Sequence, residues 1–287
     1  MRLKADLTLL LVAILWGSSF AAQRVAGQLG SVFFFNAARF MLAGLILVAV
    51  RPRFRLARPQ LLWTLAAGTI LFLASALQQA GLVTTTAGNA GFITSLYVVI
   101  VPFVMLVGWG ERPHWLAVLA VLLAGAGAFL LSTGGSLRLQ AGDALELGGA
   151  VFWSLHVVLL GKFAFRFDAI SFSAGQLLVG SILNFGAAAL FEPGPVALPA
   201  PLLGAILYTA VISLGLGYTL QIWGQKHTPP TDAAILLSLE SVFAVLGAWV
   251  WLGETLSTLQ MLGCVIILAA VVLSQARGWG RIDLEAR

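Results

Sequence analysis

Polar and aromatic side chains recur inside otherwise apolar stretches of this sequence, at spacings that place several of them on one helix face. Trp16, Ser19 and Gln23 fall at i, i+3 and i+7, and Trp153 and His156 are three residues apart. Other apolar stretches carry further polar groups, namely Gln78, Gln79, Asn89, Ser95, Tyr97, Gln221, Ser238, Glu240 and Ser241. This mixture of rings, amides and hydroxyls suits the recognition of an uncharged or zwitterionic solute with an apolar side chain.

Each of these groups also has a purely structural interpretation. Trp16 and Trp153 would then pack in the interior or face lipid, and His156 would donate one hydrogen bond to a nearby carbonyl. Gln78 and Gln221 would tie neighbouring helices together, because buried amides bridge helices in membranes. The sequence leaves both interpretations open.

The composition requires a membrane around the chain. Of 287 residues, 60% are hydrophobic and 9% charged, and the mean hydropathy is +0.99. Soluble domains carry roughly 25% charged residues, so this chain cannot build a water-soluble surface. The formal charge of +5 fits basic loops on the cytoplasmic side and does not require a nucleic-acid partner.

Apolar stretches near the length that crosses a bilayer recur along the whole chain. They predict an all-α integral membrane protein with ten transmembrane helices at about 5–23, 31–50, 60–82, 87–109, 114–133, 143–162, 169–191, 200–221, 231–252 and 257–276. Residues 1–22 also resemble a cleavable signal peptide, but Trp16 has a counterpart inside the chain. We therefore expect this segment to stay as the first helix.

The second half of the chain repeats the first. The segment 86–111, TAGNAGFITSLYVVIVPFVMLVGWGE, aligns with 229–254, PPTDAAILLSLESVFAVLGAWVWLGE, after a shift of 143 positions (254 − 111). Nearer the N-terminus, a shift of 137 (153 − 16) places Trp16 on Trp153 and Arg39 on Gln176. The pattern predicts five-helix repeats at 1–135 and 136–287, which together form one transport domain.

An odd number of helices per repeat makes the second repeat enter the membrane inverted. With the N-terminus inside, the inner loops and tails hold thirteen basic residues, namely Arg2, Lys4, Arg51, Arg53, Arg55, Arg58, Arg112, Lys162, Arg166, Lys226, Arg277, Arg281 and Arg287. The outer loops then hold Arg24 and Arg138. This asymmetry follows the positive-inside rule and predicts cytoplasmic termini.

Arg39 and Glu240 are charged residues near the middle of expected spans. At a rise of 1.5 Å per residue they lie roughly 12 Å and 15 Å from the nearer end of their helices. An isolated charge at such depth costs on the order of 2.5–3.5 kcal/mol, so each needs a partner. Three arrangements are open: the two pair together, Arg39 holds a substrate carboxylate, or Glu240 is a proton site that is neutral when desolvated.

These features resemble the drug/metabolite transporter superfamily, EamA-type, over essentially the whole chain. The resemblance rests on Trp16-Gly-Ser-Ser-Phe, on Arg39-Phe40, and on Leu239-Glu240-Ser241-Val242-Phe243-Ala244 before Leu252-Gly253-Glu254. Ser241 departs from the family, in which many members have proline, so a kink there is in question. Bacterial exporters of amino acids and related metabolites are the most similar members.

The resemblance implies a secondary carrier in the bacterial inner (plasma) membrane that exports amino acids or similar small metabolites by alternating access. It implies a central cavity lined by the first, third, fourth, sixth, eighth and ninth helices. The candidate substrate-binding residues are Trp16, Ser19, Gln78, Tyr97, Trp153, His156, Gln221 and Ser238, and the proton or charge-pair candidates are Arg39 and Glu240. Export of drugs or nucleoside-like metabolites, and a channel or lipid scramblase, are the alternatives.

Signatures of catalysis and of bound cofactors are not found. The sequence has neither H-E-x-x-H for zinc nor a Gly-Lys-Thr phosphate loop, its aspartates lie at or near helix ends, and Cys264 is its single cysteine. We therefore expect no enzyme, no cofactor and no metal. Glu111 and Glu254 recur at helix ends, where a structural role competes with one in transport. Small residues around Gly125 and Gly127 predict close packing or the edge of a homodimer.

Overall fold

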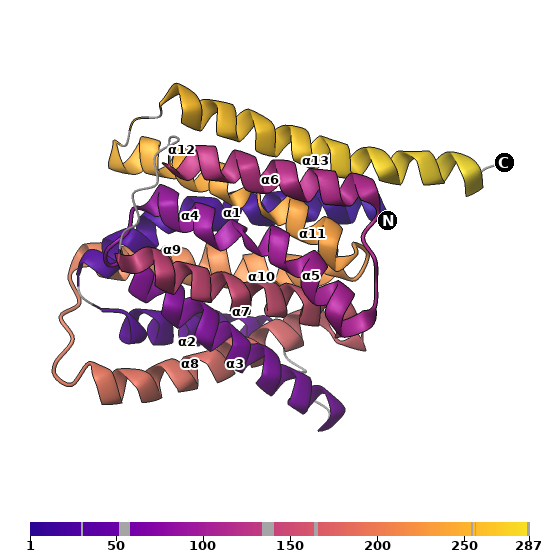
Figure 1. Ribbon diagram of the computed structural model, residues 1–287. Helices are drawn as coiled ribbons and strands as arrows, with labels where there is room; N and C mark the ends of the chain where they lie inside the picture. The colour runs from indigo at the N-terminus through magenta and orange to yellow at the C-terminus, as the bar shows by residue number, and fades with distance from the viewer. Residues whose placement is uncertain are drawn as a thin grey trace.

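Helices make up the regular structure of the described chain. The computed structural model describes residues 1–29, 31–51, 58–133, 141–163, 166–253, 255 and 257–285, and these contain no strand. The helices are α1 (Arg2–Gln28), α2 (Phe33–Val50), α3 (Arg58–Gly81), α4 (Ala87–Ser95), α5 (Tyr97–Trp109), α6 (Trp115–Thr133), α7 (Ala141–Phe163), α8 (Ala169–Phe191), α9 (Ala200–Tyr208), η2 (Thr209–Leu216), α10 (Gly217–Gln225), α11 (Pro230–Leu237), α12 (Glu240–Leu252) and α13 (Thr258–Glu285). Figure 1 shows them side by side, with the start of α1 and the end of α13 at the same end of the bundle.

Eight helical stretches in the described residues are long and apolar enough to cross a membrane. They are Arg2–Gln28, Phe33–Val50, Gln60–Gly81, Ala87–Trp109, Ala141–Phe163, Ala169–Phe191, Ala200–Gln225 and Pro230–Trp251. Two shorter apolar helices, Trp115–Leu131 and Thr258–Leu273, accompany them. The expectation of an all-α integral membrane protein is confirmed.

Two of the spans that the sequence predicts as continuous helices are interrupted near their middles. α4 ends before Leu96 and α11 ends before Ser238, and each chain then turns into the next helix. Ser95 and Ser238 both donate their hydroxyl to the carbonyl three residues earlier, Phe92 and Ile235, at 2.7 Å. Such side-chain bonds offer the backbone an alternative to the helical ladder, although the same bond made by Ser19 leaves α1 uninterrupted. The break between α11 and α12 forms although Ser241 stands where many members of the resembled family have proline.

The span Ala200–Gln225 contains a different irregularity. Between α9 and α10 the chain widens into the π-helix η2, Thr209–Leu216. A π-helix shifts the backbone hydrogen bonds by one residue, and such segments occur often at functional sites. Here η2 faces α1 and α2 and brings the carbonyl of Ser213 toward α1.

Close contacts between helices of the first and the second half of the sequence hold the bundle together. α2 packs on α8, α3 on α7, α1 on α12, and α6 on α13. At the last contact, a Cβ on Gly127 would lie 2.8 Å from the carbonyl oxygen of Gly263. Contact within the chain therefore explains the small residue at Gly127 without a second copy.

Carboxylates tie the ends of the helices. Glu192, in the connection after α8, accepts hydrogen bonds from the backbone N–H groups of residues 32, 33 and 34 at the start of α2. Glu111 forms an ion pair with Lys162 at the end of α7, which favours a structural role for Glu111. Glu254 and the expected boundary at 135/136 lie outside the described residues.

Candidate functional site

An aromatic cavity lies at the centre of the bundle. Trp16 of α1, Tyr97 of α5, Trp153 of α7 and Tyr218 of α10 line it. Tyr218 joins the two tryptophans: its ring centroid lies 5.2 Å from that of Trp16 and 6.4 Å from that of Trp153, stacked on the latter at 18°. Rings from the first and second halves of the sequence thus form one continuous apolar wall.

The remaining lining residues come from helices that are distant in the sequence. They are Ser19, Phe20, Gln23, Arg39, Phe40, Gln78, Val157, Ser213, Leu214, Gln221 and Glu240. The cavity has a volume of about 40 Å³, and one water molecule needs about 10–15 Å³. It therefore holds a few water molecules in this arrangement, and a larger molecule would need the helices to move apart.

The indole of Trp16 is fixed by the irregular backbone of η2. Its Nε1 donates to the carbonyl of Ser213 at 2.9 Å, and the hydroxyl of Ser213 donates to Ser19 at 3.3 Å. A Cβ on Gly217 would lie 2.6 Å from Trp16 Nε1, so glycine there admits the ring. The π-helix thus positions one of the two tryptophans that face each other across Tyr218.

Several buried polar atoms around the cavity make no hydrogen bond with any residue that the structure describes. They are both amide atoms of Gln221, the indole Nε1 of Trp153, the hydroxyl of Tyr97, Gln23 Oε1 and Glu240 Oε1. Buried polar groups are nearly always paired in native proteins, so a concentration of unpaired ones needs an explanation. A polar molecule in the cavity would supply the missing partners.

Arg39 and Glu240 line the same cavity but do not form an ion pair with each other. Arg39, 2% exposed, donates Nε and Nη2 to Asn36 Oδ1 at 3.0 and 2.7 Å. Its guanidinium lies 4.7 Å and 5.4 Å from the ring centroids of Phe35 and Phe40, within the range of cation–π attraction.

Glu240, 3% exposed, has no basic partner among the described residues. The hydroxyl of Tyr97 lies beside its carboxyl group in a geometry short of a formed hydrogen bond. One basic and one acidic side chain therefore line the cavity without pairing with each other. Of the three arrangements open from the sequence, direct pairing of Arg39 and Glu240 is not the one the structure adopts.

Two predicted site residues lie behind the cavity wall. His156 shares a 2.8 Å hydrogen bond with Gln176 and meets the rings of Trp153 and Tyr218 edge-on. Ser238 donates its hydroxyl to Ile235 at the helix break. His156 thus packs against two rings of the cavity wall, and Ser238 is not among the lining residues. Trp16, Ser19, Gln78, Tyr97, Trp153 and Gln221 do line the cavity.

Some residues that line the cavity were not predicted from the sequence. Tyr218 and Leu214 lie three and seven residues before Gln221, so they share its helix face, and that spacing could have identified them. Ser213 gave no such signal, because its role depends on the π-helix. The second helix also lines the cavity, through Arg39 and Phe40.

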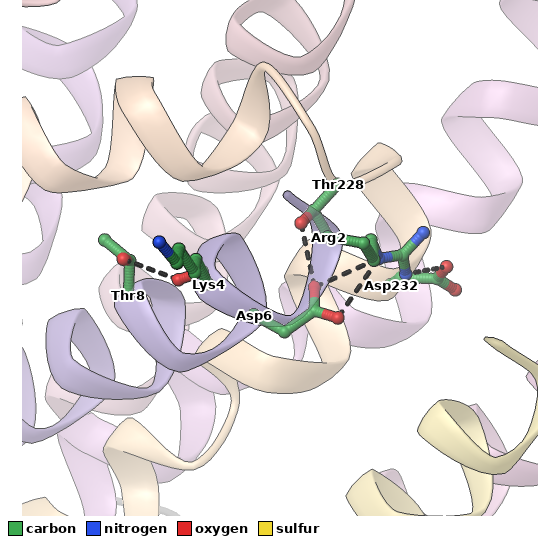
Figure 2. A network of polar contacts seen from close by, with 6 residues as sticks. All are labelled: Arg2, Lys4, Asp6, Thr8, Thr228 and Asp232. Carbon is green, nitrogen blue, oxygen red and sulfur yellow. Dashed lines mark hydrogen bonds and ion pairs between the residues drawn. The ribbon is translucent and has the colours of Figure 1, made fainter. Parts of the chain in front are cut away.

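A polar cluster ties the start of α1 to the connection between α10 and α11. Arg2 Nη2 donates to Asp232 Oδ2 at 2.7 Å, and its Nε lies 3.1 Å from both carboxylate oxygens of Asp6. Thr228 donates its hydroxyl to Asp6 at 2.8 Å. Figure 2 shows Arg2 between the two aspartates with Thr228 beside Asp6. The cluster thus links the first turn of α1 to the first turn of α11 and to the connection before it.

A second cluster lies where α3 ends and α7 begins. Asp143 Oδ1 accepts hydrogen bonds from Thr85 Oγ1 at 2.8 Å and from Asn89 Nδ2 at 2.6 Å. It joins the α3–α4 connection to the first turn of α7, as the first cluster joins the α10–α11 connection to the first turn of α1.

A helical membrane bundle around a polar-lined aromatic cavity is the architecture of a small-molecule transporter. The chain belongs to the EamA-like transporter family, whose sequence pattern matches residues 3–133 and again 140–275. A solved crystal structure shares this fold with a TM-score of 0.80 at 20% identity, over 96% of this chain and 98% of that one.

Relatives by sequence are also transporters. The chain is 33% identical over 282 residues to an uncharacterized transporter of Archaeoglobus fulgidus, covering 96% of this chain and 87% of that protein. It is 23% identical to a probable terminal-alkyne amino-acid exporter of Streptantibioticus cattleyicolor, covering 97% and 95%. A threonine/homoserine exporter of Salmonella typhimurium is 27% identical over 129 residues, 45% of this chain and 43% of that protein.

Two buried glutamines test whether the cavity amides are free of protein partners. Gln221 makes no hydrogen bond, whereas Gln79 Nε2 donates to the carbonyl of Gln23 at 2.9 Å, away from the cavity lining. We expect Gln79→Leu to lower the free energy of unfolding by about 0.5–1.5 kcal/mol and Gln221→Leu to leave it unchanged or raised. Thermal unfolding in one detergent measures both, and an equal loss in the two variants would contradict the assignment.

Proposed function

We propose that this protein is a secondary carrier that exports amino acids or similar small metabolites across the bacterial inner membrane. The observation that carries the proposal is that Arg39 and Glu240 face one aromatic cavity without pairing with each other. A zwitterion would pair with both side chains at once, its carboxylate with Arg39 and its ammonium with Glu240, which ionises when the ammonium supplies a counter-charge. An apolar side chain would then lie against Trp16, Trp153 and Tyr218.

The neighbouring polar groups support this arrangement. Asn36 and the rings of Phe35 and Phe40 hold the Arg39 guanidinium in place, so it is oriented before a substrate arrives. In the same cavity, the unpaired amide of Gln221 supplies an acceptor (Oε1) and a donor (Nε2), and the indole N–H of Trp153 supplies a second donor. Such preorganised groups bind with less loss of conformational entropy.

We further propose ten spans in two inverted repeats, with α6 and α13 as the fifth and tenth. Structural breaks support the shift of 143 positions: Leu96 and Leu239 have nearly the same backbone angles, and Gly110 and Gly253 both end their helices at φ 69°. The two separate matches to the family pattern support the same division. An even number of spans agrees with both termini lying at one end of the bundle.

Alternating access follows as the mechanism. The cavity is too small here for an amino acid, so a substrate enters only when one end of the bundle opens. The cluster of Arg2, Asp6, Thr228 and Asp232 closes the end that we assign to the cytoplasm. Its side chains must separate before a substrate can enter or leave the cavity on that side.

The charge arrangement makes a testable prediction about recognition. We expect calorimetric titration with threonine, leucine, phenylalanine, uridine and a lipophilic cation to show saturable binding of an amino acid. Its methyl ester and its N-acetyl derivative should bind about 10- to 100-fold more weakly, about 1.4–2.8 kcal/mol, because each lacks one charge.

Matched variants assign each charge to its partner. The Arg39→Gln variant should bind the free amino acid no better than its methyl ester but still better than its N-acetyl derivative. The Glu240→Gln variant should bind the free amino acid no better than the N-acetyl derivative but still better than the ester. Binding of uridine or the cation alone would favour a drug or nucleoside exporter instead. Flux through proteoliposomes that never saturates would favour a channel or scramblase.

Topology can be measured independently of any substrate. In a Cys264→Ser background, Ala197→Cys lies in the exposed connection after α8, and His114→Cys lies in the exposed connection before α6. With cytoplasmic termini, an impermeant thiol reagent added outside intact cells should label position 197 and leave position 114 unlabelled until the cells are opened. The reverse pattern would contradict the proposed orientation.

A further inference from the structure

Glu146 is a buried carboxyl group outside the cavity lining, and it was not among the candidates from sequence. It lies in α7 one turn after Asp143 and is 0% exposed. Its Oε2 accepts a 3.3 Å hydrogen bond from Thr94 Oγ1, and Oε1 has no hydrogen-bond partner among the described residues. None of the ion pairs among the described side chains includes it.

A chain of polar groups connects Glu146 with the cavity. Gln78, which lines the cavity, donates its Nε2 to Thr94 Oγ1 at 2.8 Å, and the same hydroxyl donates to Glu146. Two hydrogen bonds therefore separate the carboxyl from the cavity. In the other direction, Asp143 and Thr85 lie at the end of the bundle where α7 begins.

Packing does not explain a carboxyl group at this position. Under the proposed repeat, Glu146 corresponds to Leu9 (146 − 9 = 137), and Gly81 corresponds to Gly224. A Cβ on Gly81 would meet Glu146 Cγ at 2.7 Å, and a Cβ on Gly224 would meet Leu9 Cγ at 2.8 Å. The two contacts are the same, and an apolar side chain fills one of them. The carboxyl of Glu146 therefore needs another explanation.

The surroundings favour the neutral form of this carboxyl. From α3 it meets Gly81 and from α4 it meets Thr94, both uncharged, and on its own helix the charged group that faces it is Asp143, of the same sign. An ionised carboxylate with no counter-charge is strongly disfavoured inside a membrane protein, whereas a protonated one is tolerated.

We propose that Glu146 is a proton-binding site, separate from the cavity, that holds a proton while α3, α4 and α7 are packed together. The proton passes to water when these helices separate at the end of the bundle where α7 begins, and a proton from water restores the neutral form before they close. If the proposed transport cycle opens this end, the site links that opening to proton exchange.

Infrared spectroscopy of the purified full chain in lipid tests the site without any substrate. At neutral pH we expect the carbonyl stretch of a protonated carboxyl, lost in Glu146→Leu and retained in Glu240→Gln. Glu146→Leu should fold, because Leu9 fills the corresponding contact. Thr94→Val keeps Glu146 but removes its hydrogen-bond donor, and should shift the band to higher frequency.

Each outcome decides the proposal. A band that neither Glu146→Leu nor Thr94→Val alters, or a spectrum without such a band, overturns it. If Glu146→Leu fails to fold, the comparison with Leu9 is wrong, and the Thr94→Val shift alone decides whether the carboxyl is protonated. Because no arm needs a transported molecule, the result stands apart from the amino-acid binding experiment.

Discussion

Hydrocarbon offers no hydrogen bonds, and this constraint sorts the polar groups inside the bundle. Many are paired with backbone of another helix: Gln79 bonds to Gln23, Gln225 to Val157, and Ser181 to Ala37. These bonds fix the helices relative to one another. Six of the buried side-chain atoms without a partner among the described residues belong to residues that line one aromatic cavity, where a solute rather than lipid can satisfy them.

The same constraint explains why irregular backbone lies at the centre of the bundle. The breaks beside Ser95 and Ser238 and the π-helix η2 depart from the regular helical ladder, which membrane proteins tolerate where protein or a cavity covers the backbone. The irregular segments also position the site: η2 presents the carbonyl that holds Trp16, and α12 begins with Glu240 directly after its break.

Much of this arrangement could be predicted from the sequence, because apolar length and composition specify membrane helices and helical spacing specifies faces. Trp16 and Ser19 were found in this way, Gln221 was found as a polar group inside an apolar span, and all three reach the cavity. The spacing could not show that His156 stops behind the wall, because that depends on its bond to Gln176. Nor could it show the π-helix that brings in Ser213, or the burial of Glu146, which depend on tertiary contacts.

Accessibility of the cavity from each side tests the account most directly. In a Cys264→Ser background, a cysteine replacing Gln221 reports on the cavity wall. We predict that an impermeant thiol reagent reaches this cysteine from either face of the membrane, in right-side-out and in inverted vesicles. A saturating amino-acid substrate should change the two labelling rates in opposite directions, or lower both by occluding the cavity. A substrate that raises both rates together, or a reagent that passes through the protein, would mean a continuous pore and contradict the carrier.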